Sequence, residues 1–333
     1  MNKTIHIYFR KKTNDKHSIE NLFDPLIAEL SRNREFSIRK IEMPHSNEGL
    51  INKIKNIFFT LGQKADIHHI AGDIHYISLA LVFKKTIITV HDLYFIKDKN
   101  ILKSFLFFVF WIYIPFFLAI KIIAISDVTQ KKIVSYYRSF GNKTTVIPNF
   151  VREEFLSSKS NFASKSSYTI LHIGTKKNKN LEGLILAMKD LPLNLIVIGK
   201  LTDFQKVLLH KYRITFQEEI NLPLEKMIYL YATSGMLHFA SLSEGFGLPI
   251  LEAQCLGLPV ITSDLSPMKD VAGPGAILVH PHKPEEIRAA IIKLHQNKDL
   301  MESIINKGYQ NVKNYTINNV AQKYLNLYRS MSV

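Results

Sequence analysis

Short apolar runs alternate along the chain with longer segments in which apolar residues recur at helical spacing. The runs are rich in β-branched residues, which favours strands, and each connection is long enough to hold a helix. Strand-then-helix units of this kind predict parallel sheets with crossover helices. In the first half the expected strands are residues 5–8, 38–41, 66–70, 86–90, 122–125 and 145–147. In the second half they are residues 168–173, 195–198, 237–240, 260–262 and 276–279.

The two series of units predict two domains with a linker between them. Residues 157–167 are rich in Ser and Lys, and the expected linker spans 151–167. We expect an α/β fold with Rossmann-like, doubly wound domains at 1–150 and 168–312, and a C-terminal helix at 313–333 that could pack back on the first domain. Ligands of open α/β sheets bind outside the carboxyl ends of the strands, so residues that follow strands are functional candidates.

The segment 105–120 is apolar, holds no charged residue and contains Pro115. A membrane-spanning helix needs roughly 18 or more apolar residues, so this run is short for one. The preferred interpretation is a buried helix followed by the strand 122–125. The alternative is an interfacial helix that rests on a membrane, which the eight aromatic residues of the segment favour.

Composition and charge indicate a folded protein with a large hydrophobic core and a basic first half. The 333 residues are 47% hydrophobic and 21% charged, which allows a large core and argues against disorder. The single cysteine, Cys255, fits a reducing, cytoplasmic setting, and residues 1–12 lack the apolar region of a signal peptide. Residues 1–150 hold 22 Lys and Arg against 12 Asp and Glu. This basic half is either a solvated surface or one that favours an acidic lipid or phosphorylated partner, and no motif indicates nucleic acid.

The strongest chemical signal is the segment 244–252, which reads EGFGLPILE and follows an expected strand. Pro249 suits the first position of a helix. The two glycines let the backbone approach a ligand, and free N–H groups at a helix start favour a phosphate. Glu244 and Glu252 could then face one bound molecule and accept hydrogen bonds from its sugar hydroxyls. The alternative is a turn followed by a surface helix.

A second signal is the loop 174–180, which reads GTKKNKN and lies between an expected strand and an expected helix. Lysines at such a turn can neutralise a diphosphate, although a lysine-rich loop is also often simply solvated. Neither a Walker loop nor a Gly-x-Gly-x-x-Gly run is present.

A cluster of His68, His69, Asp73 and His75 raises the question of a metal site. Alternation along a strand sends His68 and His69 to opposite faces, so we expect no shared metal ion. Asp73 and His75 are instead candidates to line an acceptor site, or are structural.

Five segments, in this order, resemble the family-4 retaining glycosyltransferases, which are group 1 glycosyl transferases. They are His91-Asp92-Leu93, residues 123–126, residues 146–149, the loop 174–180 and the segment 244–252. The resemblance covers nearly the whole chain and implies GT-B architecture, in which two Rossmann-like domains face a central cleft. It also implies transfer of a sugar from a nucleotide-sugar, UDP- or GDP-sugar being expected, to a saccharide or lipid-linked saccharide acceptor of surface polysaccharide or glycolipid synthesis.

The resemblance also assigns roles to residues. It implies that Lys179 binds the donor diphosphate, that Glu252 binds the ribose, and that Glu244 and His91 act at the transferred sugar. The other donor-binding candidates lie beside these residues and are Gly174, Thr175, Lys176, Asn180, Gly245, Phe246, Gly247 and Leu248.

Two features depart from the family pattern. Thr175 and Lys176 stand where the family often has an arginine, and Arg10 follows the first strand in place of a Gly-Gly turn. Arg10 therefore joins Asp73 and His75 as an acceptor-side candidate. Fixed positive charge at the departing diphosphate lowers the barrier to transfer, so no metal or other cofactor is expected.

Two other functions remain open: a GT-B sugar-nucleotide epimerase, and a non-catalytic protein that binds carbohydrate or nucleotide. For a transferase, the expected partners are the donor and the acceptor. We also expect contact with an anionic membrane, namely the inner face of the cytoplasmic membrane.

Overall fold

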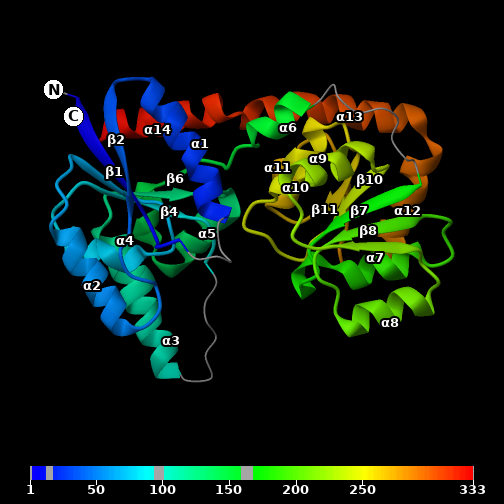
Figure 1. Cartoon of the computed structure of the whole chain (residues 1–333), viewed down its shortest axis with the longest axis horizontal. Coiled ribbons are helices and arrows are strands. Elements are labelled where there is room, and N and C mark those ends of the chain that lie inside the picture. Colours follow the sequence, from blue (N-terminus) through cyan, green and yellow to red (C-terminus); the bar gives the residue numbers. More distant parts are fainter. Residues whose placement is uncertain (1, 13–17, 94–100, 159–167, 333) are drawn as a thin grey trace. The chain divides into compact units, whose positions relative to one another are not determined.

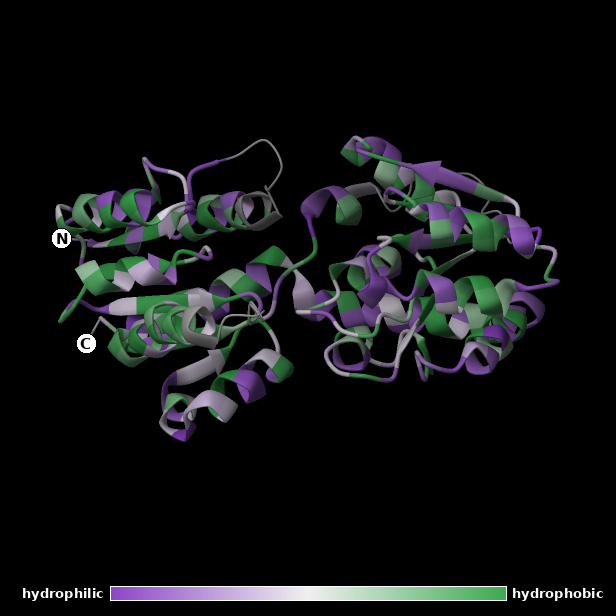
Figure 2. Ribbon diagram, turned by 90° about the horizontal axis from the view of Figure 1, so that it is seen from below, coloured by the Kyte–Doolittle hydropathy of each residue, from purple (hydrophilic) through white to green (hydrophobic). Residues whose placement is uncertain are grey.

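The computed structural model describes residues 2–12, 18–93, 101–158 and 168–332, and the chain forms two units (Figure 1). Unit 1 comprises Met1–Asn149 and Ile317–Val333, and unit 2 comprises Phe150–Thr316. Each unit contains a six-stranded parallel sheet. The strands are largely hydrophobic and the helices mix polar and apolar residues, as Figure 2 shows. The predicted α/β class with two Rossmann-like domains is therefore confirmed.

The sheet of unit 1 has the strand order β2-β1-β3-β4-β5-β6. Its strands are β1 (Lys3–Phe9), β2 (Phe36–Glu42), β3 (Ile67–Ile70), β4 (Thr86–Val90), β5 (Lys121–Ala124) and β6 (Thr144–Val146). Its helices are α1 (Ser18–Arg32), α2 (Leu50–Leu61), η1 (His75–Ala80), α3 (Ile101–Phe108), η2 (Val109–Tyr113), α4 (Ile114–Leu118), α5 (Asp127–Tyr136), η3 (Arg138–Lys143) and α14 (Ile317–Ser330). The order changes direction between β1 and β3, which is the switch point where such sheets bind ligands.

The C-terminal helix α14 is built into the core of unit 1. The hydroxyl of Tyr328, a fully buried residue of α14, lies 2.8 Å from Nδ1 of His69 on β3. The other ring nitrogen of His69 lies 2.7 Å from the hydroxyl of Thr89. On the opposite face of β3, Nδ1 of His68 lies 2.7 Å from the hydroxyl of Tyr8. The two histidines therefore face opposite sides and serve the core.

Residues 105–118 of the apolar run lie in one continuous helical segment, composed of α3, the π-helical turn η2 and α4. Ile112 and Phe116 are buried, but Phe105 and Phe117 are 60% and 63% exposed. The preferred prediction of a buried helix therefore holds for one face only. Among the described residues, no helix is both long and apolar enough to cross a bilayer.

The sheet of unit 2 has the strand order β12-β11-β10-β7-β8-β9. Its strands are β7 (Thr169–Ile173), β8 (Asn194–Ile198), β9 (Phe216–Glu219), β10 (Met236–Phe239), β11 (Val260–Ser263) and β12 (Ile277–Val279). Its helices are α6 (Glu153–Ser157), η5 (Lys177–Lys179), α7 (Leu181–Met188), α8 (Asp203–Lys211), α9 (Leu224–Thr233), α10 (Leu248–Cys255), α11 (Met268–Ala272), α12 (Pro284–Gln296), α13 (Lys298–Val312) and η6 (Lys313–Tyr315). Here the switch point lies between β7 and β10.

Part of the expected linker is folded into unit 2. Phe155 of α6 is fully buried, and its ring packs edge-on against the ring of Tyr231 at a centroid distance of 5.4 Å. Residues 159–167, the remainder of the expected linker, lie outside the described residues.

Candidate active site

The two strongest motifs of the sequence meet at the switch point of unit 2. The loop 174–180 follows β7, the segment 244–252 comes after β10, and these two strands are neighbours in the sheet. The backbone N–H of Leu242 donates to the carbonyl of Asn178 at 2.8 Å, and the Asn178 side chain donates to the carbonyl of Ser243 at 3.0 Å. The sheet order thus joins two loops that are distant in sequence, at the place where such sheets bind ligands.

Lys179 passes over Gly174 and reaches Glu244. Its ammonium nitrogen lies 2.7 Å from Oε1 of Glu244 and 4.8 Å from the centre of the Phe239 ring. Gly174 has a φ of +89°, and a Cβ atom there would lie 2.8 Å from Cγ of Lys179. A glycine is therefore needed at this position for both its conformation and its small size. The two charged side chains are only 21% and 13% exposed, so the loop fixes their positions.

The other candidates in this loop have different environments. Asn180 is buried with a φ of +60°, and its side-chain amide donates to the carbonyls of Ala240 and Pro281 at 3.0 and 2.6 Å. The hydroxyl of Thr175 donates to the carbonyl of Lys200 at 2.6 Å. Thr175 and Asn180 therefore shape the loop, whereas Lys176 is exposed to solvent.

The segment 244–252 turns into helix α10 at Gly247, which has a φ of +115°. The helix begins at Leu248, one residue before the predicted start at Pro249. Within the described part of the chain, no side chain caps this helix. Pro249 has no N–H and that of Ile250 donates to the carbonyl of Gly247 at 3.0 Å, so the N–H of Leu248 is the donor of the first turn that can serve an anion. Phe246, between the two glycines, is buried and lies edge-on to a neighbouring tyrosine ring.

Glu252 lies inside α10 and is held by two residues that the sequence analysis missed. Its Oε1 accepts a hydrogen bond from Arg152 at 3.2 Å, and its Oε2 accepts one from the hydroxyl of Tyr231 at 2.7 Å. Burial, followed by the charge of Glu252, raises the pKa of Tyr231 well above its usual value, so the phenol is a neutral donor. Neither residue belongs to a motif, which is why only the fold reveals them.

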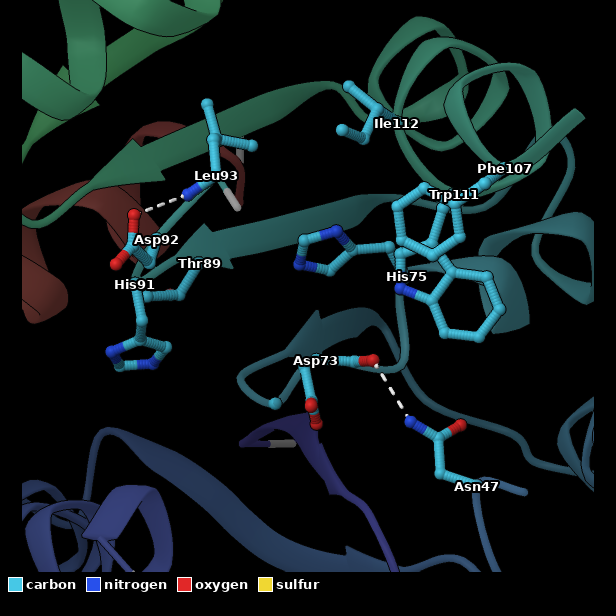
Figure 3. Close-up of a pocket in the computed structure, with 11 residues that line it drawn as sticks. Asn47, Asp73, His75, Thr89, His91, Asp92, Leu93, Phe107, Trp111 and Ile112 are labelled. Atoms are coloured by element: carbon cyan, nitrogen blue, oxygen red, sulfur yellow. Dashed lines mark hydrogen bonds between the residues drawn. The ribbon is translucent and has the colours of Figure 1, made fainter. Parts of the chain in front are cut away.

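The candidates of unit 1 surround a cavity of about 400 Å³ next to the switch point of that sheet (Figure 3). Asp73, His75 and His91 line it from the strand ends, and Phe107 and Trp111 line it from the helical segment. The guanidinium of Arg10 lies 3.4 Å from the carboxylate of Asp73. The three predicted acceptor-side residues, Arg10, Asp73 and His75, therefore lie in the same region. The cavity has a polar side and an aromatic side.

His91 is a neutral side chain at the edge of this cavity. Its Nε2 lies 2.9 Å from the carbonyl oxygen of Ala71, which can only accept, so Nε2 carries the proton and Nδ1 is an acceptor. Burial lowers the pKa of His91 to about 4. His75 is buried as well, and burial also lowers its pKa. Among the described residues, no group of three or more His, Cys, Asp or Glu side chains is arranged to hold a metal ion.

Comparison with known proteins bears directly on these motifs. Residues 153–311, which include the loop 174–180 and the segment 244–252, match the family model described as "Glycosyl transferases group 1". The match lies within unit 2 and covers just under half of the chain, so this unit is similar to that family.

Similar proteins span different shares of this chain. The O-antigen chain mannosyltransferase B of Escherichia coli is 29% identical over 171 residues, which are 48% of this chain and 45% of that protein. The O-antigen chain mannosyltransferase RfbU of Salmonella typhimurium is 27% identical over 247 residues, or 71% of this chain and 67% of that protein. The match therefore spans less than half of the first relative and about two thirds of the second.

A solved glycosyltransferase from Rickettsia africae has the same fold as this chain. Its TM-score is 0.78 at 17% sequence identity, and the alignment covers 99% of this chain and 98% of that one. Together with the two parallel sheets, this likeness confirms the predicted GT-B fold.

Proposed function

We propose that this protein transfers a sugar from a nucleotide-sugar to a saccharide acceptor in the synthesis of a surface polysaccharide. The observation that carries the proposal is the contact of Lys179 with Glu244 at the switch point of unit 2, in the segment that continues into α10 and Glu252. A lysine, two carboxylates and an uncapped helix start match the phosphates, ribose and sugar of such a donor in charge and hydrogen bonding. The two relatives, both O-antigen chain mannosyltransferases, support the same activity and the same product class.

In the proposed complex the donor is a UDP- or GDP-sugar. Its diphosphate binds Lys179 and the start of α10, its ribose hydroxyls bind Glu252, and its sugar contacts Glu244. Lys179 sits in a partly shielded loop, where a charge-assisted hydrogen bond to phosphate is stronger than at a solvated surface.

The proposed transfer retains the anomeric configuration and needs no metal ion. Breaking the glycosidic bond places negative charge on the leaving diphosphate, and a fixed lysine and helix start can stabilise that charge. Turnover should therefore survive treatment with EDTA. Complete loss of activity with EDTA, restored by magnesium or manganese, would contradict this assignment.

We propose the cavity of unit 1 as the acceptor site. Asp73 and His75, with Arg10 behind Asp73, offer hydrogen bonds to sugar hydroxyls, and His91 offers an acceptor nitrogen. The aromatic side formed by Phe107 and Trp111 suits a lipid-linked saccharide. Cys255 is the single cysteine of the sequence and is buried, which is in keeping with a cytoplasmic location, and we propose that the protein works at the inner face of the membrane.

A two-stage experiment tests this function. A thermal-shift screen of UDP-, GDP-, dTDP- and ADP-sugars comes first, because a ligand at about 100 times its dissociation constant stabilises the fold by roughly 2.7 kcal/mol. The stabilising donor is then incubated with and without an oligosaccharide acceptor. Transfer only with acceptor supports the proposal, conversion of the donor alone indicates an epimerase, and binding without turnover indicates a non-catalytic protein.

A further inference from the structure

Helix α2 has its polar and apolar faces exchanged relative to an ordinary surface helix. Its fully buried residues are Asn56 and Thr60, whereas Leu50, Ile51 and Phe58 are 73%, 71% and 68% exposed. A helix that covers a soluble domain normally turns its apolar side toward the core. The exposed side of α2 therefore has the character of a surface that is itself meant to be covered.

The orientation of α2 is fixed by polar contacts on its inner side. The side chain of Asn56 accepts from the backbone N–H of His45 at 3.1 Å and donates to the carbonyl of His45 at 3.1 Å and to the hydroxyl of Tyr76 at 3.0 Å. The hydroxyl of Thr60 donates to the backbone carbonyl of Asn56 at 2.8 Å. Because these buried groups are satisfied, rotating the helix to hide its apolar side would leave them without partners.

A second helical segment adds to the same region. Phe105, Phe110 and Phe117, on α3, η2 and α4, are 60%, 48% and 63% exposed. The two helical segments are neighbours in Figure 1. The ammonium of Lys53 on α2 lies 4.6 Å from the centre of the Trp111 ring on the second segment. We call the exposed apolar side chains of these helices the apolar face: Leu50, Ile51, Ile54, Phe58, Leu61, Phe105, Leu106, Phe110 and Phe117.

Charge indicates what covers the apolar face. Helix α2 carries Lys53 and Lys55, and neither α2 nor residues 104–118 of the second segment contain an Asp or Glu. An anionic bilayer offers acidic headgroups for the lysines and an apolar interior for the side chains. A second copy of the chain would instead set lysines against lysines, which is unfavourable.

We infer that the apolar face seats unit 1 on an anionic membrane, with the exposed side of α2 inserted among the lipids. The inference extends the membrane location proposed above and names α2 as the main contact. The same helical segment that contributes Phe105 and Phe110 to the apolar face contributes Phe107 and Trp111 to the wall of the cavity. An acceptor anchored in that membrane is therefore the substrate class that this arrangement suits.

Vesicle sedimentation of the full chain tests the inference without donor or acceptor. Vesicles of phosphatidylcholine with phosphatidylglycerol are compared with vesicles of phosphatidylcholine alone. We expect binding to the acidic vesicles that weakens in high salt, and a fall of about tenfold or more in the double variant Ile51→Ser, Phe58→Ser. The matched control is Phe204→Ser, Val207→Ser on α8 of unit 2, where the side chains are 61% and 63% exposed, and it should bind like the unchanged protein.

Three outcomes would overturn the inference. One is equal binding to acidic and neutral vesicles, and another is equal loss in the α2 and α8 variants. The third is a dimer in sedimentation velocity that the α2 variant abolishes, because the apolar face would then bind a second copy.

Donor binding by thermal shift is measured on the same α2 variant. Retained donor binding with lost vesicle binding supports the inference, and lack of any donor binding in the unchanged protein counts against the proposed transferase only.

Discussion

The ammonium group of Lys179 lies 2.7 Å from the carboxylate of Glu244, although 65 positions separate the two residues in the chain. The pair joins the loop after β7 to the segment that comes after β10, across the switch point of the sheet. A diphosphate bound by Lys179 would therefore compete with Glu244 for the same cation. This relationship couples the two halves of the proposed donor site.

Lys179→Ala should weaken binding of the nucleotide-sugar. A charge-assisted contact to phosphate contributes roughly 1.5–3 kcal/mol, which corresponds to a rise in Kd of about 10- to 150-fold. Isothermal titration with the donor identified by the thermal-shift screen measures the change. Lys211→Ala, at an exposed position of α8, is the control and should leave Kd unchanged. Equal affinities for Lys179→Ala and the unchanged protein would remove Lys179 from the phosphate site.

Glu244→Gln and Glu252→Gln should differ in kinetics. Glu252 is proposed to hold the ribose, away from the bond that breaks, so its contact is equal in ground and transition states and its loss mainly raises the donor KM. Glu244 is proposed to contact the transferred sugar, where positive charge develops, so its loss should lower kcat more than it raises KM. Full kinetic curves with donor and acceptor decide the matter. Matching or reversed patterns would show that these two roles are wrongly assigned.

Tyr231→Phe should affect both stability and donor binding. The substitution keeps the buried ring but removes the hydroxyl that donates to Oε2 of Glu252 at 2.7 Å. A buried carboxylate oxygen left without its donor costs about 1–3 kcal/mol of unfolding free energy, and the freed carboxylate should also raise the donor KM. Urea denaturation and donor kinetics measure the two effects. The control is Tyr168→Phe, at a residue that is 55% exposed. If Tyr231→Phe has as small an effect as this control on stability and KM, Tyr231 does not position Glu252.

Acidification should destabilise the protein before its carboxylates titrate. Burial lowers the pKa of His69 to about 3 and the pKa values of His91 and His172 to about 4, whereas an unfolded histidine titrates near 6.5. Between these values the unfolded chain binds protons that the folded protein does not. The free energy of unfolding should therefore decrease as the pH falls from about 6.5 toward 4. Urea denaturation at neutral pH and at about pH 5 measures the slope, and a flat profile would mean that these histidines are not neutral in the fold.

Much of the fold could be predicted because buried parallel strands appear in sequence as continuous apolar runs. Strand β9 was missed, since its sequence FQEE at the edge of the sheet lacks that signal. The exposed side of α2 was missed for a different reason. Periodicity predicts a helix with an apolar side, but only the contacts of Asn56 reveal that this side faces outward.

The candidate site could be predicted where residues follow strands and form motifs. Lys179 and Glu244 both meet this condition, and the fold brings them into contact. Arg152 and Tyr231 lie on segments without a motif, at 100 and 21 positions from Glu252, so nothing in the sequence indicates that they share its carboxylate. Partners that are set by packing alone become visible only in three dimensions.

The placement of α14 has a consequence for synthesis on the ribosome. Unit 1 holds the first 149 residues, yet its core also contains Tyr324 and Tyr328 from the last helix. Domains usually fold in the order in which they emerge, with the N-terminal one first. Here unit 2 is continuous and can fold while translation proceeds, whereas unit 1 waits for the helix at Ile317–Ser330. A nascent chain halted before this helix would contain a folded unit 2 and an incompletely folded unit 1.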